Sequence, residues 1–442
     1  MGDSPLYSVL RTELQGNILV ASRAIKAGDK IVHDEVPFVW QSVSVPGSCF
    51  HKFCDECGTV LAKELIEELA GFMELEDTVN REQLLPVLQE LLPFNVKRCR
   101  YTNNSCNNNC GVMYCSDQCM NLGQSKGHSW LCESYQTVQN STQQMHATDT
   151  KGHYGLAAKI YARIAAQCLE RVLHDDSIDI SEEAMRVGME MLAEYHTEDF
   201  TRTMHVYRTG RMEIDQGMFD NIIFPAYFSS VLSTPLALCK EIFQQSGTVL
   251  WGVGALGVMR SEQFLSSPIF SEQFFSKIIG TFVVNCLSVH VPSPLNFMLS
   301  RASQSRSLTE PATTDSGEQG LLMEQAVNVL LHYRNRNQLS HQHLSEDRNS
   351  GNENKIFLGM SGSGLFPVFS KSNHSCLCNT IIHGSDKVSV SIVASEDIPQ
   401  GAEITNCYIH HPTLNGGESV DYTATESTGV AVAVAPAGPA VV

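Results

Sequence analysis

The feature that most constrains this chain is a set of eight metal-ligating side chains, arranged as four close pairs. Seven are cysteines and one is a histidine: Cys54, Cys57, Cys106, Cys110, Cys115, Cys119, His128 and Cys132. Two tetrahedral zinc ions need eight ligands, and sulfur ligands favour zinc over magnesium or calcium. Because protein fills all four positions at each ion, both zinc ions are predicted to be structural.

The alternative to zinc is a set of buried free thiols or disulfides. The first residues of the chain contain no apolar signal-peptide core, which disfavours a secreted disulfide scaffold, and we therefore favour zinc. We expect the pairs to interleave, with the first and third on one ion and the second and fourth on the other. Cys99 is an alternative ligand within the second pair.

The size and charge of the chain limit its class. At 442 residues, two or three domains or one interrupted domain are expected. A formal net charge of −18 disfavours direct nucleic-acid binding and favours basic protein partners. The longest apolar stretch, Ile278 to Val291, is too short for a bilayer and contains Asn285. We expect a monomer of the cytoplasm, the nucleus or both, without membrane contact.

The hydrophobic pattern predicts strands near the N-terminus and helices after them. The expected strands are Leu6–Leu10, Ile18–Ser22, Lys30–His33 and Phe38–Val45. The expected helices cover residues 62–77, 80–92, 154–174, 181–195 and 235–246. The stretch 274–291 is compatible with a buried helix or strand.

The C-terminal part of the chain alternates polar and β-rich segments. Residues 300–319 and 337–355 are polar and are expected to be mobile surface insertions around a short helix near 320–334. From residue 356 the pattern turns β-rich, with clear alternation in Lys387–Val393. The low-complexity end of the chain is expected to be disordered.

One motif is a decoy. Gly252, Gly254 and Gly257 match the G-x-G-x-x-G spacing of dinucleotide-binding turns. That reading requires a strand before the glycines, whereas the pattern predicts a helix ending near residue 246. A tight apolar turn within a helical region is the better account.

The cysteine-rich segment resembles the MYND zinc finger. The tract from Val112 to Cys119, followed by His128 and Cys132, is close to the core of that family. The 48 residues between Cys57 and Cys106 depart from the compact family pattern, and the predicted helical hairpin fills them. MYND fingers bind peptides, often proline-containing ones, so the resemblance implies an interaction surface.

Two further stretches resemble the core of SET-domain methyltransferases. Asn373-His374-Ser375-Cys376 with Asn379 is similar to the NHSCxPN motif, with Cys378 in place of proline. Gly401-Ala402-Glu403-Ile404 with Tyr408 is similar to the GEEIxxxY motif. The segments Gly16–Leu19 and Ala24–Asp29 resemble the opening of a SET domain. A finger between that opening and these motifs resembles the SET-and-MYND (SMYD) family, nearest its divergent branch without a C-terminal helical-repeat domain.

The resemblance implies an α+β fold, a SET-type arrangement of small sheets split by an inserted MYND finger and a helical insert. The implied parts are SET strands in 1–50, the double zinc finger with its helical insertion in 51–135, and a helical insert in 136–275. The SET core would occupy 276–411 with a mobile insertion at 300–355, followed by a disordered tail over 412–442.

The implied activity is S-adenosylmethionine-dependent N-methylation of lysine in histones or other basic protein segments. By resemblance, Tyr408 is the catalytic tyrosine. The implied cofactor-binding residues are Gly16, Asn17, Asn285, Asn373 and His374. The alternative is a catalytically weak adaptor that uses its MYND finger to bind peptides.

Three departures from the family bear on this alternative. Ile18 stands where the Gly-x-Gly turn of the family has its second glycine, and residues 409–442 lack the usual cysteine cluster that follows the tyrosine. The final segment also resembles no family sequence. A replacement third zinc site is conceivable from residues near one another in the sequence, namely Cys376, Cys378, Cys407 and His410 or His411.

Overall fold

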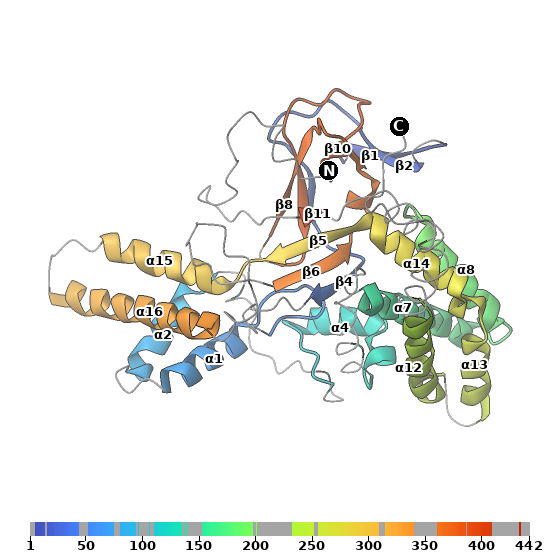
Figure 1. Cartoon of the computed structure of the whole chain (residues 1–442), viewed down its shortest axis with the longest axis horizontal. Helices are drawn as coiled ribbons and strands as arrows, with labels where there is room; N and C mark the ends of the chain where they lie inside the picture. The colour runs from blue at the N-terminus through green and yellow to red at the C-terminus, as the bar shows by residue number, and fades with distance from the viewer. Residues whose placement is uncertain are drawn as a thin grey trace, which may run out of the picture.

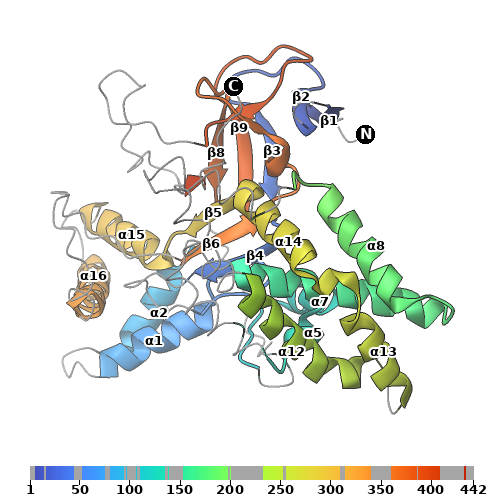
Figure 2. The same cartoon turned by 45° about the vertical axis from the view of Figure 1, so that its right-hand side comes forward.

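Small β-sheets form the centre of the molecule, and helices lie on two opposite sides of them (Figures 1 and 2). The computed structural model describes residues 5–13, 16–43, 52–74, 80–93, 96, 106, 110–134, 138, 153–197, 200, 232–251, 255–308, 314–339, 360–385, 387–408 and 433–434. These residues form a mixed α/β structure, which agrees with the coarse class predicted above.

The N-terminal strands pair with one another or with C-terminal strands. β1 (Tyr7–Thr12) and β2 (Gly16–Ala21) form an antiparallel hairpin. β3 (Lys30–Glu35) pairs with β9 (Val390–Ala394), which also pairs with β8 (Thr380–Gly384). All four predicted N-terminal strands are thus found, with ends shifted by a few residues.

A further sheet joins four distant parts of the chain. Its order is β11 (Ala433–Val434), β5 (Cys286–Val291), β6 (Met360–Leu365) and β4 (Val39–Val43). A separate two-residue ladder pairs β7 (Asn373–His374) in parallel with β10 (Thr405–Asn406). These sheets share one core, whose most buried members include Leu19, Leu287, Phe366, Val390, Ile392 and Ile404.

The second core belongs to the helices on the right in Figure 1. These helices are α7 (His153–His174), α8 (Ile180–Ala193), α12 (Thr234–Leu250), α13 (Ala255–Leu265) and α14 (Glu272–Asn285). Trp130 of the short helix α5 (His128–Leu131) inserts among their aromatic side chains, 5.1 Å from Trp251 between ring centroids. The end of the cysteine-rich segment is therefore fixed to this helical core.

A third core combines two insertions that are far apart in the sequence. α1 (Ala62–Glu74) and α2 (Arg81–Leu91) pack against α15 (Pro294–Leu308) and α16 (Thr314–Leu339), on the left in Figures 1 and 2. Phe72 and Tyr333 meet edge to face with ring centroids 5.4 Å apart. The segment that separates the zinc-ligand pairs thus shares a core with the segment between β5 and β6.

This packing corrects the expectation of a mobile insertion at 300–355. Residues 300–308 and 314–339 are helical, and Ala302, Ala326 and Leu330 are fully buried. Their polar composition hides the few apolar positions that contact α1 and α2, and those contacts supply the stability that helical periodicity does not. Residues 340–355 lie outside the described residues.

Two other expectations are settled. The stretch 274–291 is both a helix and a strand, because α14 runs into β5 at Cys286 without a loop. Part of the tail expected to be disordered is ordered, since Ala433–Val434 pairs with the edge of β5 that β6 leaves open. The rest of 412–442 lies outside the described residues.

The dinucleotide-binding reading lacks its strand, because α12 extends to Leu250 immediately before the glycines. Gly252 and Gly254 themselves lie outside the described residues. None of the described helices has the length and apolar character needed to cross a lipid bilayer.

A buried carboxylate ties the N-terminal strands to the segment that carries Asn373. Glu35, the last residue of β3, accepts hydrogen bonds from the backbone N–H groups of Val368 and Phe369, the latter at 3.0 Å. These bonds hold the 3-10 turn Phe369–Lys371. Burial raises the pKa of Glu35 from 4.5 to about 7, although these bonds and Lys371 act in the opposite direction.

The raised pKa of Glu35 predicts a pH-dependent stability. Folding then favours the protonated carboxyl, so its stabilising contribution is complete below about pH 4.5 and is lost as pH rises through about 7. Relative to Glu35→Gln, the wild type should lose on the order of 2 kcal/mol between pH 5 and pH 8. Thermal melts of both proteins across this range measure the difference, and a constant difference would contradict the assignment.

Candidate metal centre and candidate cofactor site

The first ligand pair is set by a tight turn. The backbone N–H of Gly58 donates to the Cys54 carbonyl at 2.8 Å, and the N–H of Cys54 donates to the Thr59 carbonyl at 2.9 Å. Gly58 has a φ of +69°, a left-handed conformation that glycine adopts without strain. The turn places Cys54 and Cys57 side by side.

The third pair is set by the start of a helix. Ser116 is the N-cap of α4 (Asp117–Ser125), and its hydroxyl accepts a hydrogen bond from the Cys119 N–H at 3.2 Å. Cys115 precedes the cap and Cys119 lies in the first turn. Their sulfur atoms are 3.5 Å apart, and Cys115 lies 3.6 Å from Cys57.

The eight predicted ligands form two groups, and the grouping is interleaved as expected. Each group brings its four ligand atoms within 4.8 Å of one another. The first contains Cys54, Cys57, Cys115 and Cys119, and the second contains Cys106, Cys110, His128 and Cys132. Zinc–sulfur bonds of about 2.3 Å give tetrahedral edges of about 3.8 Å, close to the separations found here. Both groups are compatible with zinc.

The second group is the more buried one. Cys106 and Cys132 place their sulfur atoms 3.3 Å apart, and the Cys110 sulfur lies 3.5 Å from His128 Nε2. Burial lowers the pKa of His128, which keeps the imidazole neutral and able to bind a metal ion. None of the described cysteines forms a disulfide.

The Cys54–Cys57 turn also contacts the rest of the fold. The Cys57 carbonyl accepts a hydrogen bond from the Val388 N–H at 2.8 Å, and the Glu56 carbonyl accepts one from Trp40 Nε1 at 2.9 Å. A Cβ atom on Gly58 would lie only 2.1 Å from the Val388 side chain. The metal loop therefore lies directly on the sheet region.

The predicted SET-like motifs meet at the β7–β10 ladder. Thr405 pairs with Asn373, and Asn406 pairs with His374. The Asn373 side-chain amide donates to Glu403 at 2.8 Å. Two motifs separated by some thirty residues thus form one small parallel ladder.

Tyr408 is fixed against His374. The Tyr408 backbone N–H donates to His374 Nδ1 at 3.0 Å, and the two ring centroids are 5.5 Å apart. Because Nδ1 accepts this bond, a neutral His374 carries its proton on Nε2. The Tyr408 hydroxyl donates to the Ser372 carbonyl, and burial raises its pKa well above the usual range.

The turn after α8 links the other predicted cofactor residues. Asn17, next to Gly16, donates to the Glu194 carbonyl at 3.5 Å, and Glu194 pairs with Lys371 at 3.4 Å. The buried Asn285 donates to the His196 carbonyl and to the Thr281 carbonyl, both at 2.7 Å. Every predicted cofactor residue thus lies close to either this turn or the β7–β10 ladder.

Sequence reasoning missed the polar residues that support the ladder. The Asn406 amide donates to Ser372 Oγ at 2.6 Å, and that hydroxyl donates to the Ile404 carbonyl at 3.0 Å. Both side chains are fully buried, so they stabilise the ladder rather than face a ligand. Glu194 and His196 contribute through a loop at the end of a helix, and no motif in the sequence marks it.

The departure at Ile18 does not distort the backbone. Ile18 pairs with Leu10 in the β1–β2 hairpin, its side chain is 6% exposed, and its φ is not positive. A glycine-like conformation is therefore not needed at that position.

A third metal group is not found among the described residues. Cys376 lies 3.3 Å from His374 Nε2, but Cys376, Cys378 and Cys407 do not assemble three ligand atoms. His410 and His411 lie outside the described residues.

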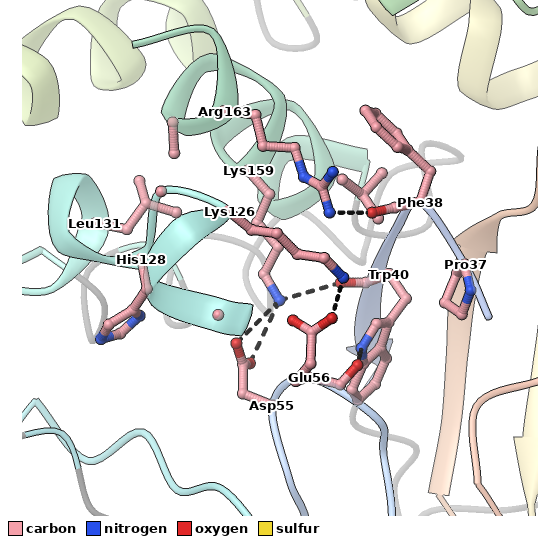
Figure 3. A pocket seen from close by; sticks show the side chains of 14 residues that line it. Pro37, Phe38, Trp40, Asp55, Glu56, Lys126, His128, Leu131, Lys159 and Arg163 are labelled. Carbon is pink, nitrogen blue, oxygen red and sulfur yellow. Dashed lines mark hydrogen bonds and ion pairs between the residues drawn. The ribbon is translucent and has the colours of Figure 1, made fainter. Parts of the chain in front are cut away.

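A small pocket lies between α7 and two metal loops, which are the turn 54–58 and the segment 117–131 with α4 and α5 (Figure 3). It has a volume of about 50 Å³ and is lined by residues of β4, both metal loops and α7. None of the predicted cofactor residues lines it.

Comparison with known proteins does not assign the chain, since no protein-family model and no curated protein sequence matches it.

The interleaved grouping predicts a specific pattern of zinc loss. The wild type should hold two zinc ions, and Cys57→Ala with Cys119→Ala should hold one, because both changes affect the same ion. Cys57→Ala with Cys106→Ala should hold none. Zinc released under denaturing conditions to a chromogenic chelator gives the counts.

The buried Cys168, which belongs to neither group, supplies the control. Cys168→Ala should retain two zinc ions. A sequential grouping of the pairs would reverse the results of the two double variants, so the opposite pattern would contradict the interleaved arrangement.

Proposed function

We propose that this protein is an S-adenosylmethionine-dependent protein-lysine N-methyltransferase. The observation that carries the proposal is the gathering of Asn17, Asn285, Asn373, His374 and Tyr408 around one ladder and one turn. These residues come from four distant parts of the chain. They are the ones for which the resemblance to SET domains implies cofactor binding and catalysis.

In this reaction the protein aligns the amine with the methyl group and forms no covalent bond to either. The bound cofactor would supply an electrophilic sulfonium methyl group. The attacking lysine must be neutral, although its amine has an ordinary pKa of about 10.4. An apolar channel and a nearby positive charge both favour the neutral amine. The tasks left to this chain are alignment of the amine and placement of charge.

Tyr408 is suited to alignment. Its raised pKa keeps the hydroxyl protonated at neutral pH, so it does not act as a base. Its proton is directed to the Ser372 carbonyl, which leaves the oxygen lone pairs free to accept a hydrogen bond from an amine. Through its backbone bond to His374, the tyrosine is also tied to the proposed cofactor residues.

The asparagines are suited to holding an ammonium group. Asn285 uses both of its amide hydrogens on backbone carbonyls, and Asn373 directs its amide to Glu403. The acceptor of each side chain is then its Oδ1 atom. Such acceptors match the α-ammonium group at the methionine end of the cofactor.

The substrate is proposed to be a basic protein segment, such as a histone tail. The net charge of −18 attracts lysine-rich chains and raises their local concentration. The two zinc ions have a structural role in this proposal, because protein atoms fill their coordination shells.

A second candidate is a peptide-binding adaptor. The small pocket against the metal loops favours it, because that pocket lies apart from the proposed cofactor residues. The two functions differ in their dependence on Tyr408.

Replacement of Tyr408 by Phe should lower methyl transfer roughly 100-fold or more, because the amine loses its aligning group. The measurement is incorporation of labelled methyl from S-adenosylmethionine into core histones and a library of lysine peptides. The wild type should label lysine, and Tyr408→Phe should fold and retain two zinc ions.

Tyr154 provides a matched control, since its buried hydroxyl has no hydrogen-bond partner among the described residues. Tyr154→Phe should therefore retain activity. Equal labelling by wild type and Tyr408→Phe would contradict the assigned role. If cells that lack the protein showed a phenotype and cells that carry Tyr408→Phe did not, the adaptor function would be favoured.

A further inference from the structure

The pocket between the metal loops and α7 is too small for a whole cofactor but large enough for one functional group. Its volume of about 50 Å³ compares with the 300 Å³ or more of typical small-molecule sites. On a comparable measure, a cavity of about 10–15 Å³ holds one water molecule. An occupant would therefore insert a group of a few atoms from a larger molecule.

Five charged side chains lie among the mainly apolar residues that line this pocket (Figure 3). Lys126 pairs with Glu56, and Lys159 contacts Asp55 at 3.3 Å and the Trp40 carbonyl at 3.1 Å. Asp55 and Glu56 lie between the metal-group residues Cys54 and Cys57. The two lysines therefore neutralise the carboxylates of the metal loop.

Arg163 is the cation that remains. Its guanidinium lies 4.1 Å from the centroid of the Phe38 ring and donates to the Phe38 carbonyl. In the part of the chain that the structure describes, it makes no ion pair. A guanidinium has five N–H donors, so most of its donor capacity is unused by these residues.

Arg163 is also partly buried. Burial lowers its pKa to about 10, and the negative charge of Glu56 offsets part of this decrease. At neutral pH the side chain remains charged. A negative group beside it would restore the stabilisation that burial removes.

We propose that this pocket binds a single carboxylate, presented by a peptide partner as an acidic side chain or a free C-terminus. Arg163 would hold it in a two-pronged hydrogen-bonded pair, with Phe38 stacked on the guanidinium. The inference concerns a site separate from the proposed methyl-transfer residues and does not depend on that activity.

The charge count favours a carboxylate over a phosphate. Among the side chains that line the pocket, three cations and two carboxylates leave one positive charge. The neighbouring four-cysteine group would carry a net charge of −2 with zinc bound, which further disfavours a doubly charged ligand. A carboxylate balances this charge. A phosphate carries up to two negative charges at neutral pH, and its second charge would face Asp55 and Glu56 without compensation.

Trp40 provides a direct reporter. Its indole N–H donates to the Glu56 carbonyl at 2.9 Å, and it is one of three tryptophans in the chain. Trp130 and Trp251 lie in the helical core and serve as internal references. The zinc-loaded full chain, labelled with ¹⁵N-tryptophan, would be titrated with sodium acetate at constant ionic strength.

Acetate should shift the Trp40 signal saturably, with a dissociation constant on the order of 10 mM for so small a ligand. Neutral acetamide should not shift it, and inorganic phosphate should bind more weakly than acetate. Equal shifts with acetamide, stronger binding of phosphate, or no saturable shift with acetate would each overturn the proposal.

Variants locate the binding group. Arg163→Met should weaken acetate binding at least tenfold, and Arg163→Lys should weaken it several-fold while keeping the charge. Arg260, paired with Asp176 at 2.6 Å outside the pocket, is the matched control, and Arg260→Met should bind acetate as the wild type does. If both Arg163 variants retained wild-type acetate binding, the assignment would fail.

Two capped proline-containing pentapeptides, identical except for a central Glu or Gln, test the peptide source. The Glu peptide should bind at least tenfold more tightly than the Gln peptide, and Arg163→Met should remove the difference. Equal binding of the two peptides would exclude an acidic side chain, and equal binding of the Gln peptide with a free and with an amidated C-terminus would exclude the C-terminus as well; both results together would overturn the peptide assignment.

Discussion

The turn from Cys54 to Gly58 is the point on which the arrangement of the molecule depends. Its two cysteines belong to a metal group with Cys115 and Cys119. Its backbone carbonyls accept hydrogen bonds from the Trp40 indole and from the Val388 N–H. Its carboxylates pair with Lys126 and with Lys159 of α7. Zinc-centred loops of this kind contribute folding free energy, because the site does not exist in the unfolded chain. A metal ion held by this group would therefore fix the relative positions of the cysteine-rich segment, the sheets and the helical core.

Long insertions surround this turn, and the parts of the candidate site still lie close together. α1 and α2 leave the metal loop and share a core with α15 and α16, which leave the central sheet. α7 and α8 belong to another core, and the backbone carbonyls of the turn after α8 accept hydrogen bonds from the side chains of Asn17 and Asn285. Each insertion thus returns to the sheets that it interrupts. The candidate cofactor residues meet where the turn after α8 and the β7–β10 ladder lie close together.

Local patterns predicted much of this structure. Cysteine spacing identified all eight members of the metal groups and their interleaving, because close ligand pairs constrain geometry strongly. Alternating apolar residues located the main strands, and helical periodicity located α1, α2, α7, α8 and α12. The same patterns missed α15 and both ends of α16, of which they predicted only 320–334, because the polar parts of these helices are stabilised by tertiary contacts. The roles of Ser372, Asn406 and the turn at Glu194 depend on long-range hydrogen bonds, which no local pattern encodes.

The central claim is that the site around Asn373, His374 and Tyr408 binds S-adenosylmethionine. Calorimetric titration of the full chain, with its two zinc ions retained, tests this claim most directly. The account predicts saturable one-to-one binding that Asn373→Ala weakens at least tenfold without loss of zinc. Absence of binding to folded, zinc-loaded protein would contradict it and would favour the alternative proposal of a peptide-binding adaptor.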